Sequence, residues 1–130
     1  MRAAIGAIAC LAVAGCQHLS YVDPEFSDTG GVMAAEITDA VLRSGNRTVH
    51  VIVPEQSDHA LSVTVPASLQ GAGVAVDETG PELRYYITKL YGGILMRVKL
   101  LNEWTARFFV RGKGGIEPAG PVTIRKDLRA

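Results

Sequence analysis

The chain has 130 residues, of which 48% are hydrophobic, so it is long enough to bury one core and too short for two ordinary domains. This composition excludes the disordered, collagen-like and low-complexity classes. Its 13 basic side chains balance 13 acidic ones, and a formal net charge of zero excludes a nucleic-acid binder held by bulk positive charge.

The N-terminal segment has the pattern of a lipoprotein signal. Arg2 precedes an uncharged apolar run over residues 3–15, which is too short to span a bilayer as a helix. The run ends at Val13-Ala14-Gly15-Cys16, which resembles the lipobox of bacterial lipoproteins, where the cysteine receives lipid and becomes the first mature residue. We expect a signal peptide over residues 1–15 and a covalent lipid on Cys16; the alternative is an ordinary signal peptide with an incidental cysteine.

The lipobox has consequences for both cysteines. Cys10 leaves with the signal peptide and Cys16 carries lipid, so no thiol remains for a disulfide, a zinc site or nucleophilic catalysis. Several acyl chains on one cysteine give stable membrane attachment. In lipoproteins an aspartate after the cysteine favours inner-membrane retention, so by this resemblance Gln17 favours the periplasmic face of the outer membrane.

Residues 16–29 are mostly polar, and we expect them to form a lipidated tether to a single periplasmic domain over residues 30–130. Asp28 or Thr29 can cap a helix that runs to about Ser44. Its expected buried face holds Met33, Ile37, Ala40, Val41 and Ser44, and its expected exposed face holds Glu36, Asp39 and Arg43.

The next segments differ in how clearly they are patterned. Residues 48–53 are rich in β-branched side chains, and Val49, Val51 and Val53 alternate with His50 and Ile52. This pattern predicts a strand that ends at Pro54. Residues 57–73 fit either a helix, kinked or restarted at Pro66, or a strand; we favour the helix, followed by a short strand over residues 74–76.

The last third predicts an antiparallel β-meander with turns at Gly92-Gly93 and Asn102-Glu103, followed by a short strand over residues 122–125. The expected apolar face holds Leu83, Tyr85, Ile87, Ile94, Met96, Val98, Leu100, Trp104, Ala106, Phe108 and Val110. The expected opposite face holds Arg84, Tyr86, Leu95, Arg97, Lys99, Arg107, Phe109 and Arg111. Two helices covering the apolar face of this small sheet give an α+β fold.

Candidate catalytic and metal-binding residues are weak. His18, His50 and His59 show no metal-ligand spacing, and the contiguous side chains of Ser57-Asp58-His59 do not converge as a catalytic triad requires. Glu36 and Asp39 are more simply an exposed helix face, and the segment Gly112–Gly115 lacks phosphate-loop spacing and is more simply a hairpin turn. We therefore expect no enzyme, no metal, and no cofactor apart from the lipid on Cys16.

Charge is distributed unevenly along the chain. Residues 21–82 carry ten acidic and two basic side chains, whereas residues 83–130 carry three acidic and ten basic ones. Basic side chains on the outward face of the meander are either a solvated surface that discourages aggregation or a docking surface. The docking interpretation assigns partner binding to Arg84, Tyr86, Arg97, Lys99, Arg107, Phe109 and Arg111. Apolar Phe109 and Leu95 on that face favour a covered surface.

Short motifs along the mature chain resemble the TrbH family of conjugal-transfer lipoproteins. They follow the lipobox as Gly71-Ala72-Gly73-Val74-Ala75-Val76, Leu83-Arg84-Tyr85-Tyr86, Arg97-Val98 in the second hairpin strand, Pro118-Ala119-Gly120 and Ile124-Arg125-Lys126. Pro66 departs from the helix that the family pattern would place there.

The resemblance implies an outer-membrane lipoprotein subunit of a conjugative, type IV secretion apparatus, with a structural and docking role. By analogy of fold, the domain is expected to be similar to the N-terminal domain of secretins. Expected partners are outer-membrane lipid, core-complex proteins and a second copy of the chain, without direct nucleic-acid binding. The alternative is a periplasmic lipoprotein that binds peptidoglycan or another anionic ligand on the basic face.

Overall fold

The computed structural model describes residues 19–54 and 60–126. Two α-helices, α2 (Gly30–Ser44) and α3 (Leu61–Gly71), and a 3₁₀ segment, η1 (Pro24–Thr29), pack with one sheet. The strands are β1 (Tyr21–Val22), β2 (Thr48–Val51), β3 (Ala75–Val76), β4 (Glu82–Leu90), β5 (Gly93–Leu100), β6 (Glu103–Gly112), β7 (Gly115–Pro118) and β8 (Thr123–Lys126). The α+β class is confirmed. The expected signal peptide, Cys16, His18 and Ser57-Asp58-His59 lie outside the described residues.

The sheet is mixed, with the main path β3-β2-β4-β5-β6-β7. Strands β4, β5 and β6 form the antiparallel meander that the sequence predicts. In addition, β1 and β2 run parallel to β4 and pair with its two halves, and β3 runs parallel to β2. On the other side, β7 and β8 pair with the two ends of β6. Both long outer strands of the meander are thus covered by two short strands each.

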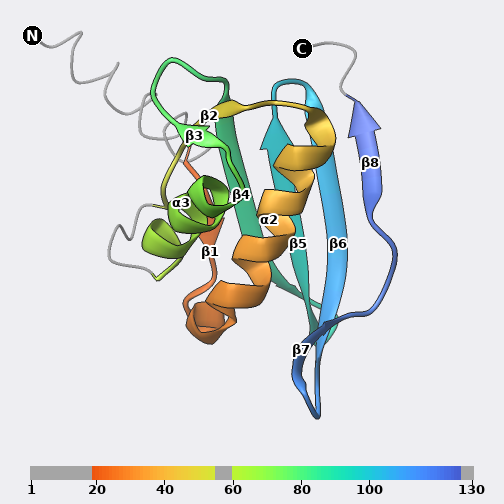
Figure 1. Cartoon of the computed structure of the whole chain (residues 1–130). Helices are drawn as coiled ribbons and strands as arrows, with labels where there is room; N and C mark the ends of the chain where they lie inside the picture. Colours follow the sequence, from red (N-terminus) through yellow and green to blue (C-terminus); the bar gives the residue numbers. More distant parts are fainter. Residues whose placement is uncertain (1–18, 55–59, 127–130) are drawn as a thin grey trace, which may run out of the picture.

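Both helices lie on the same face of the sheet, in front of it in Figure 1. The predicted apolar face of α2 is confirmed, because Met33, Ile37 and Val41 are fully buried. Opposite them, β4 and β5 contribute the inward residues that alternation predicts, Leu83, Tyr85, Ile87, Ile94, Met96, Val98 and Leu100. Burial of these apolar side chains supplies the main stabilisation of the fold.

The segment for which the sequence allows a helix or a strand forms a helix, α3. It continues through Pro66 as one element, so the expected restart at this proline is wrong. Its buried residues, Leu61, Val65 and Leu69, recur every four positions and face the core. A hydrogen bond of 2.7 Å between the hydroxyls of Thr38 and Ser68 joins it to α2.

The second half of the expected tether belongs to the domain. Val22 in β1 and Phe26 in η1 are buried in the core. Ser20, also buried, donates its hydroxyl hydrogen to the carbonyl of Ile52 and accepts a hydrogen bond of 3.0 Å from the amide of Tyr85. This hydroxyl fills the gap along β4 between the end of β2 and the start of β1. A two-residue strand leaves no periodic pattern, so the sequence did not predict it.

The two meander turns fall one residue earlier than expected. Tyr91 and Gly92 connect β4 to β5 with φ of 48° and 78°, as a type I′ turn requires. Leu101 and Asn102 connect β5 to β6, so Leu100 pairs with Glu103. In such two-residue hairpins the paired residues share a face, so even-numbered inward residues on β5 require odd-numbered inward residues on β6.

The predicted faces of β6 are therefore inverted. Phe109 is fully buried on the helix side, paired with Ile94, and Thr105 is also buried there. Trp104 and Phe108 point to the other side, paired with Lys99 and Leu95. The placement of Phe109 on the outward face, and of Trp104 and Phe108 on the inward one, was wrong.

Candidate functional site

The sheet face opposite the helices, which we call the open face, is not covered by any helix or strand of the described chain (Figure 1). Strand register arranges its side chains in three rows across the sheet. The first row is Arg84, Lys99, Trp104 and Arg125; the second is Tyr21, Tyr86, Arg97, Ala106 and Thr123; the third is Thr88, Leu95 and Phe108. Cations and aromatic rings thus occupy the first two rows, and the third is largely apolar.

Arg97 lies at the centre of the open face. Its guanidinium carbon is 5.4 Å from the ring centroid of Tyr86 and 5.9 Å from that of Trp104, within cation–π range. The two rings are themselves 5.7 Å apart, and the Lys99 ammonium is 5.5 Å from the Trp104 ring. These contacts hold the guanidinium against a pair of aromatic rings that also contact each other.

Arg84 and Tyr86 on β4 also face the open side, as the sequence predicts. Arg84 forms an ion pair of 2.6 Å with Glu82 on the same strand. Burial raises the pKa of the Tyr86 phenol above its ordinary value, while the nearby charges of Arg84 and Arg97 lower it in part. Tyr86 therefore stays protonated at neutral pH and remains a hydrogen-bond donor.

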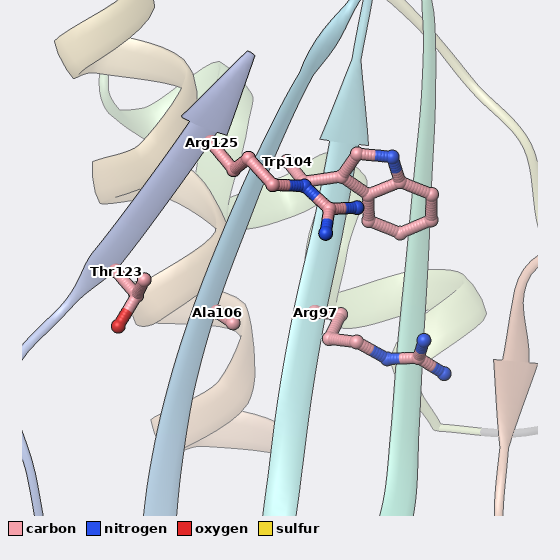
Figure 2. A pocket seen from close by; sticks show the side chains of 5 residues that line it. All are labelled: Arg97, Trp104, Ala106, Thr123 and Arg125. Atoms are coloured by element: carbon pink, nitrogen blue, oxygen red, sulfur yellow. The ribbon is translucent and has the colours of Figure 1, made fainter. Parts of the chain in front are cut away.

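A hollow of about 270 Å³ opens on this face, lined by Arg97, Trp104, Ala106, Thr123 and Arg125. It exists because the small side chains of Ala106 and Thr123 continue the row of Arg97, beside the larger row of Trp104 and Arg125. Figure 2 shows Arg125 reaching from β8 toward the Trp104 ring, with Arg97 on the β5 side of the hollow. Two cations and one aromatic ring from three strands thus line the hollow.

Three of the expected partner-binding residues lie on the helix side instead. Arg107 is bound to Glu36 of α2: its Nη1 donates to both carboxylate oxygens at 3.1 Å, and its Nε donates to the Gly120 carbonyl at 3.0 Å. Arg111 lies beside the ring of Phe26, 5.9 Å from its centroid. With Phe109 in the core, these residues belong to the packing of helices and loops on the sheet.

Glu36 was expected on an exposed helix face, which is wrong. It is buried, and its carboxylate accepts the two hydrogen bonds from Arg107. The apolar stripe of α2 is wide enough to bring position 36 against β6. The ion pair therefore connects a helix to the sheet.

Three residues of the open face were missed as site residues: Trp104, Phe108 and Arg125. Phe108 lies over Gly93, where an added Cβ would clash with the Phe108 ring and lie 2.7 Å from the backbone carbonyl oxygen of Phe109, so only glycine fits there. The signal that would have located them is the two-residue length of the β5–β6 turn, which transfers the known face of β5 to β6.

The structure brings no catalytic or metal-binding group together around the remaining candidate residues that it describes. His50 is half-buried in β2, and no group of three metal-binding side chains occurs among residues 19–54 and 60–126. In the same ranges, no helix has both the length and the apolar character needed to cross a bilayer. The open face is therefore the feature of the described chain that calls for a functional explanation.

Comparison with protein-family models, with curated proteins and with solved structures returns no match for the chain. The resemblances to the TrbH family and to secretin N-terminal domains therefore remain predictions.

Proposed function

We propose that the chain is a lipid-anchored subunit of a conjugative, type IV secretion apparatus, with a structural and docking role at the periplasmic face of the outer membrane. The lipobox at Cys16 and the short motifs similar to the TrbH family support the anchor and the apparatus. The open face, with Arg97 against the rings of Tyr86 and Trp104, carries the docking role.

Interface composition is the physical reason for this assignment. Protein interfaces are enriched in tryptophan, tyrosine and arginine, and these residues supply most hot spots. An uncovered sheet face ordinarily alternates toward polar residues, yet β6 turns Trp104, Phe108 and Val110 outward. A partner that covers this face would bury the rings and leave the cations to select it by charge.

The docking role is tested by charge reversal and co-purification from membranes. A triple variant with Arg97→Glu, Lys99→Glu and Arg125→Glu is expected to lose most cross-linked envelope partners. The matched control reverses three exposed cations away from the open face, with Arg43→Glu, Arg47→Glu and Lys113→Glu, and has the same net charge. Equal loss of partners in both variants would contradict docking at the open face. Circular dichroism checks that both variants fold.

The anchor is tested separately by membrane fractionation. Cys16→Ser is expected to leave an unprocessed chain that no longer reaches the outer membrane, because the lipid-bearing thiol is absent. Cys10→Ser removes a cysteine within the expected signal peptide and should be processed normally. Outer-membrane recovery of mature Cys16→Ser protein would overturn the lipid anchor.

A second candidate function is binding of peptidoglycan or another anionic ligand on the same face. The hollow that combines the Trp104 ring with the guanidiniums of Arg97 and Arg125 favours it, since sugars stack on aromatic rings and carboxylates bind arginine. Sedimentation with purified sacculi, with the triple variant as control, would support this function if binding occurs without any protein partner.

A further inference from the structure

Arg97 and Arg107 differ in their hydrogen bonds, although they lie close together in the sheet. Arg97 of β5 pairs with Ala106, the residue before Arg107 in β6. Arg107 gives Nη1 to a carboxylate and Nε to a carbonyl. The Nε of Arg97 is buried, and no hydrogen-bond acceptor reaches it within residues 19–54 and 60–126. Unlike Arg107, Arg97 therefore has no acceptor within the described chain that fixes the direction of its guanidinium, and cation–π contacts position it instead.

The surroundings of Arg97 prepare it for such a ligand. The rings of Tyr86 and Trp104 already hold the guanidinium in place, so little side-chain entropy remains to be lost when an acceptor binds. Arg125 lies across the hollow, and neither arginine forms an ion pair with a described residue. Two guanidinium groups thus line one hollow, and guanidinium groups are the donors that carboxylates bind most strongly.

The rest of the open face indicates what carries the carboxylate. The cations occupy two rows of the sheet, and the next row contains Leu95 and Phe108. A nucleic acid would use the cations but not the apolar row beside them, because its phosphates require a basic surface along their whole length. A protein segment that alternates acidic and apolar side chains places its carboxylates against the cations and its apolar groups against the rings.

We propose that the hollow between Arg97 and Arg125 binds a carboxylate side chain from an acidic, extended segment of a partner protein. Arg97 and Arg125 donate to the carboxylate oxygens, and an apolar neighbour of the acidic residue packs on Trp104 and Phe108. This inference rests on the proposed docking function and specifies the chemistry of the partner.

The test uses Trp104, the single tryptophan of the chain, as a fluorescent reporter inside the site. The full chain in detergent is titrated with a synthetic peptide that alternates glutamate and leucine, and with a matched peptide that has glutamine in place of glutamate. The glutamate peptide is expected to change the Trp104 emission saturably, and the glutamine peptide is expected to bind at least about tenfold more weakly.

Single variants assign the binding to the two arginines. Arg97→Gln and Arg125→Gln should each weaken the glutamate peptide by about tenfold or more, because each removes a charge-assisted hydrogen bond. Arg43→Gln, on the exposed side of α2, should leave the affinity unchanged. Added salt should weaken the glutamate peptide more than the glutamine peptide.

Three results would overturn the carboxylate site. They are equal binding of the two peptides, unchanged affinity in both arginine variants, and tighter binding of inorganic phosphate or a single-stranded DNA oligonucleotide. If the peptide fails to bind while the triple charge reversal still releases membrane partners, this site is wrong and the docking function stands. If the peptide binds but no envelope partner is recovered, the docking function is wrong and the site stands.

Discussion

The two faces of the sheet differ in where their aromatic rings lie and in what their arginines contact. On the helix side, Phe109 is in the core and Arg107 has its charge matched by Glu36. On the open face, Phe108 and Trp104 point away from the helices and Arg97 contacts rings instead of a carboxylate. On the helix side the partly buried charge of Arg107 is thus paired within the domain, whereas the open face has cationic donors and apolar surface that an added partner would contact.

The largest expected difference concerns two adjacent phenylalanines of β6. Phe109→Ala should lower the free energy of unfolding by about 3–5 kcal/mol, because it leaves a cavity in the core. Phe108→Ala should lower it by less than about 2 kcal/mol, since this ring covers Gly93 on a half-exposed face. Urea unfolding of the two variants gives both values. Equal losses would show that the open face is packed as tightly as the core.

A smaller difference is expected between the two arginines. Arg107→Gln should lower the free energy of unfolding by about 2 kcal/mol, because Glu36 would keep a mostly buried carboxylate without its cation. Arg97→Gln should cost less than about 1 kcal/mol, the size of a partly exposed cation–π contact. The same urea measurement compares them. A larger loss for Arg97→Gln would mean that Arg97 is a structural residue.

The smallest expected effect concerns Tyr85 and Tyr86. Tyr85 is fully buried and its hydroxyl has no hydrogen-bond partner in the described chain, so Tyr85→Phe should raise the free energy of unfolding by about 1 kcal/mol at neutral pH. Tyr86→Phe should change it less, because the Tyr86 ring is only half-buried. Thermal or urea unfolding at pH 7 measures both, and a loss of stability in Tyr85→Phe would contradict an unsatisfied hydroxyl.

Tyr85 also predicts that the free energy of unfolding depends on pH in the alkaline range. Burial raises the pKa of the folded Tyr85 phenol well above its ordinary value near 10. Above that ordinary value the unfolded chain loses the proton first, so native stability is complete at lower pH and falls as the pH rises further. Tyr85→Phe should reduce this slope more than Tyr86→Phe does. Equal slopes in the two variants would contradict it.

The sequence predicted the elements whose pattern is local. The apolar stripe of α2 and the alternation of β4 and β5 identify their buried residues because burial repeats every few positions. The pairing of Tyr21 with Tyr86 joins residues far apart in the chain, and a strand as short as β1 has no period of its own. The parallel half of the sheet was therefore missed.

The candidate site was predicted in part. Arg84, Tyr86, Arg97 and Lys99 were placed on the correct face because their strands alternate cleanly. Strand β6 misled the prediction because its outward set, with Trp104 and Phe108, is more apolar than its inward set. A core rule based on hydropathy selects the wrong face in such a strand, and this conflict is itself typical of a functional surface.

Ser20 fixes the N-terminal end of the described fold close in sequence to the proposed lipid anchor. Its hydroxyl is fixed inside the sheet by Ile52 and Tyr85, and it lies four residues after Cys16. Four residues of fully extended chain reach at most about 14 Å. If Cys16 carries lipid, as proposed, this short connection holds the domain close to the bilayer surface, and a partner must itself extend close to the membrane.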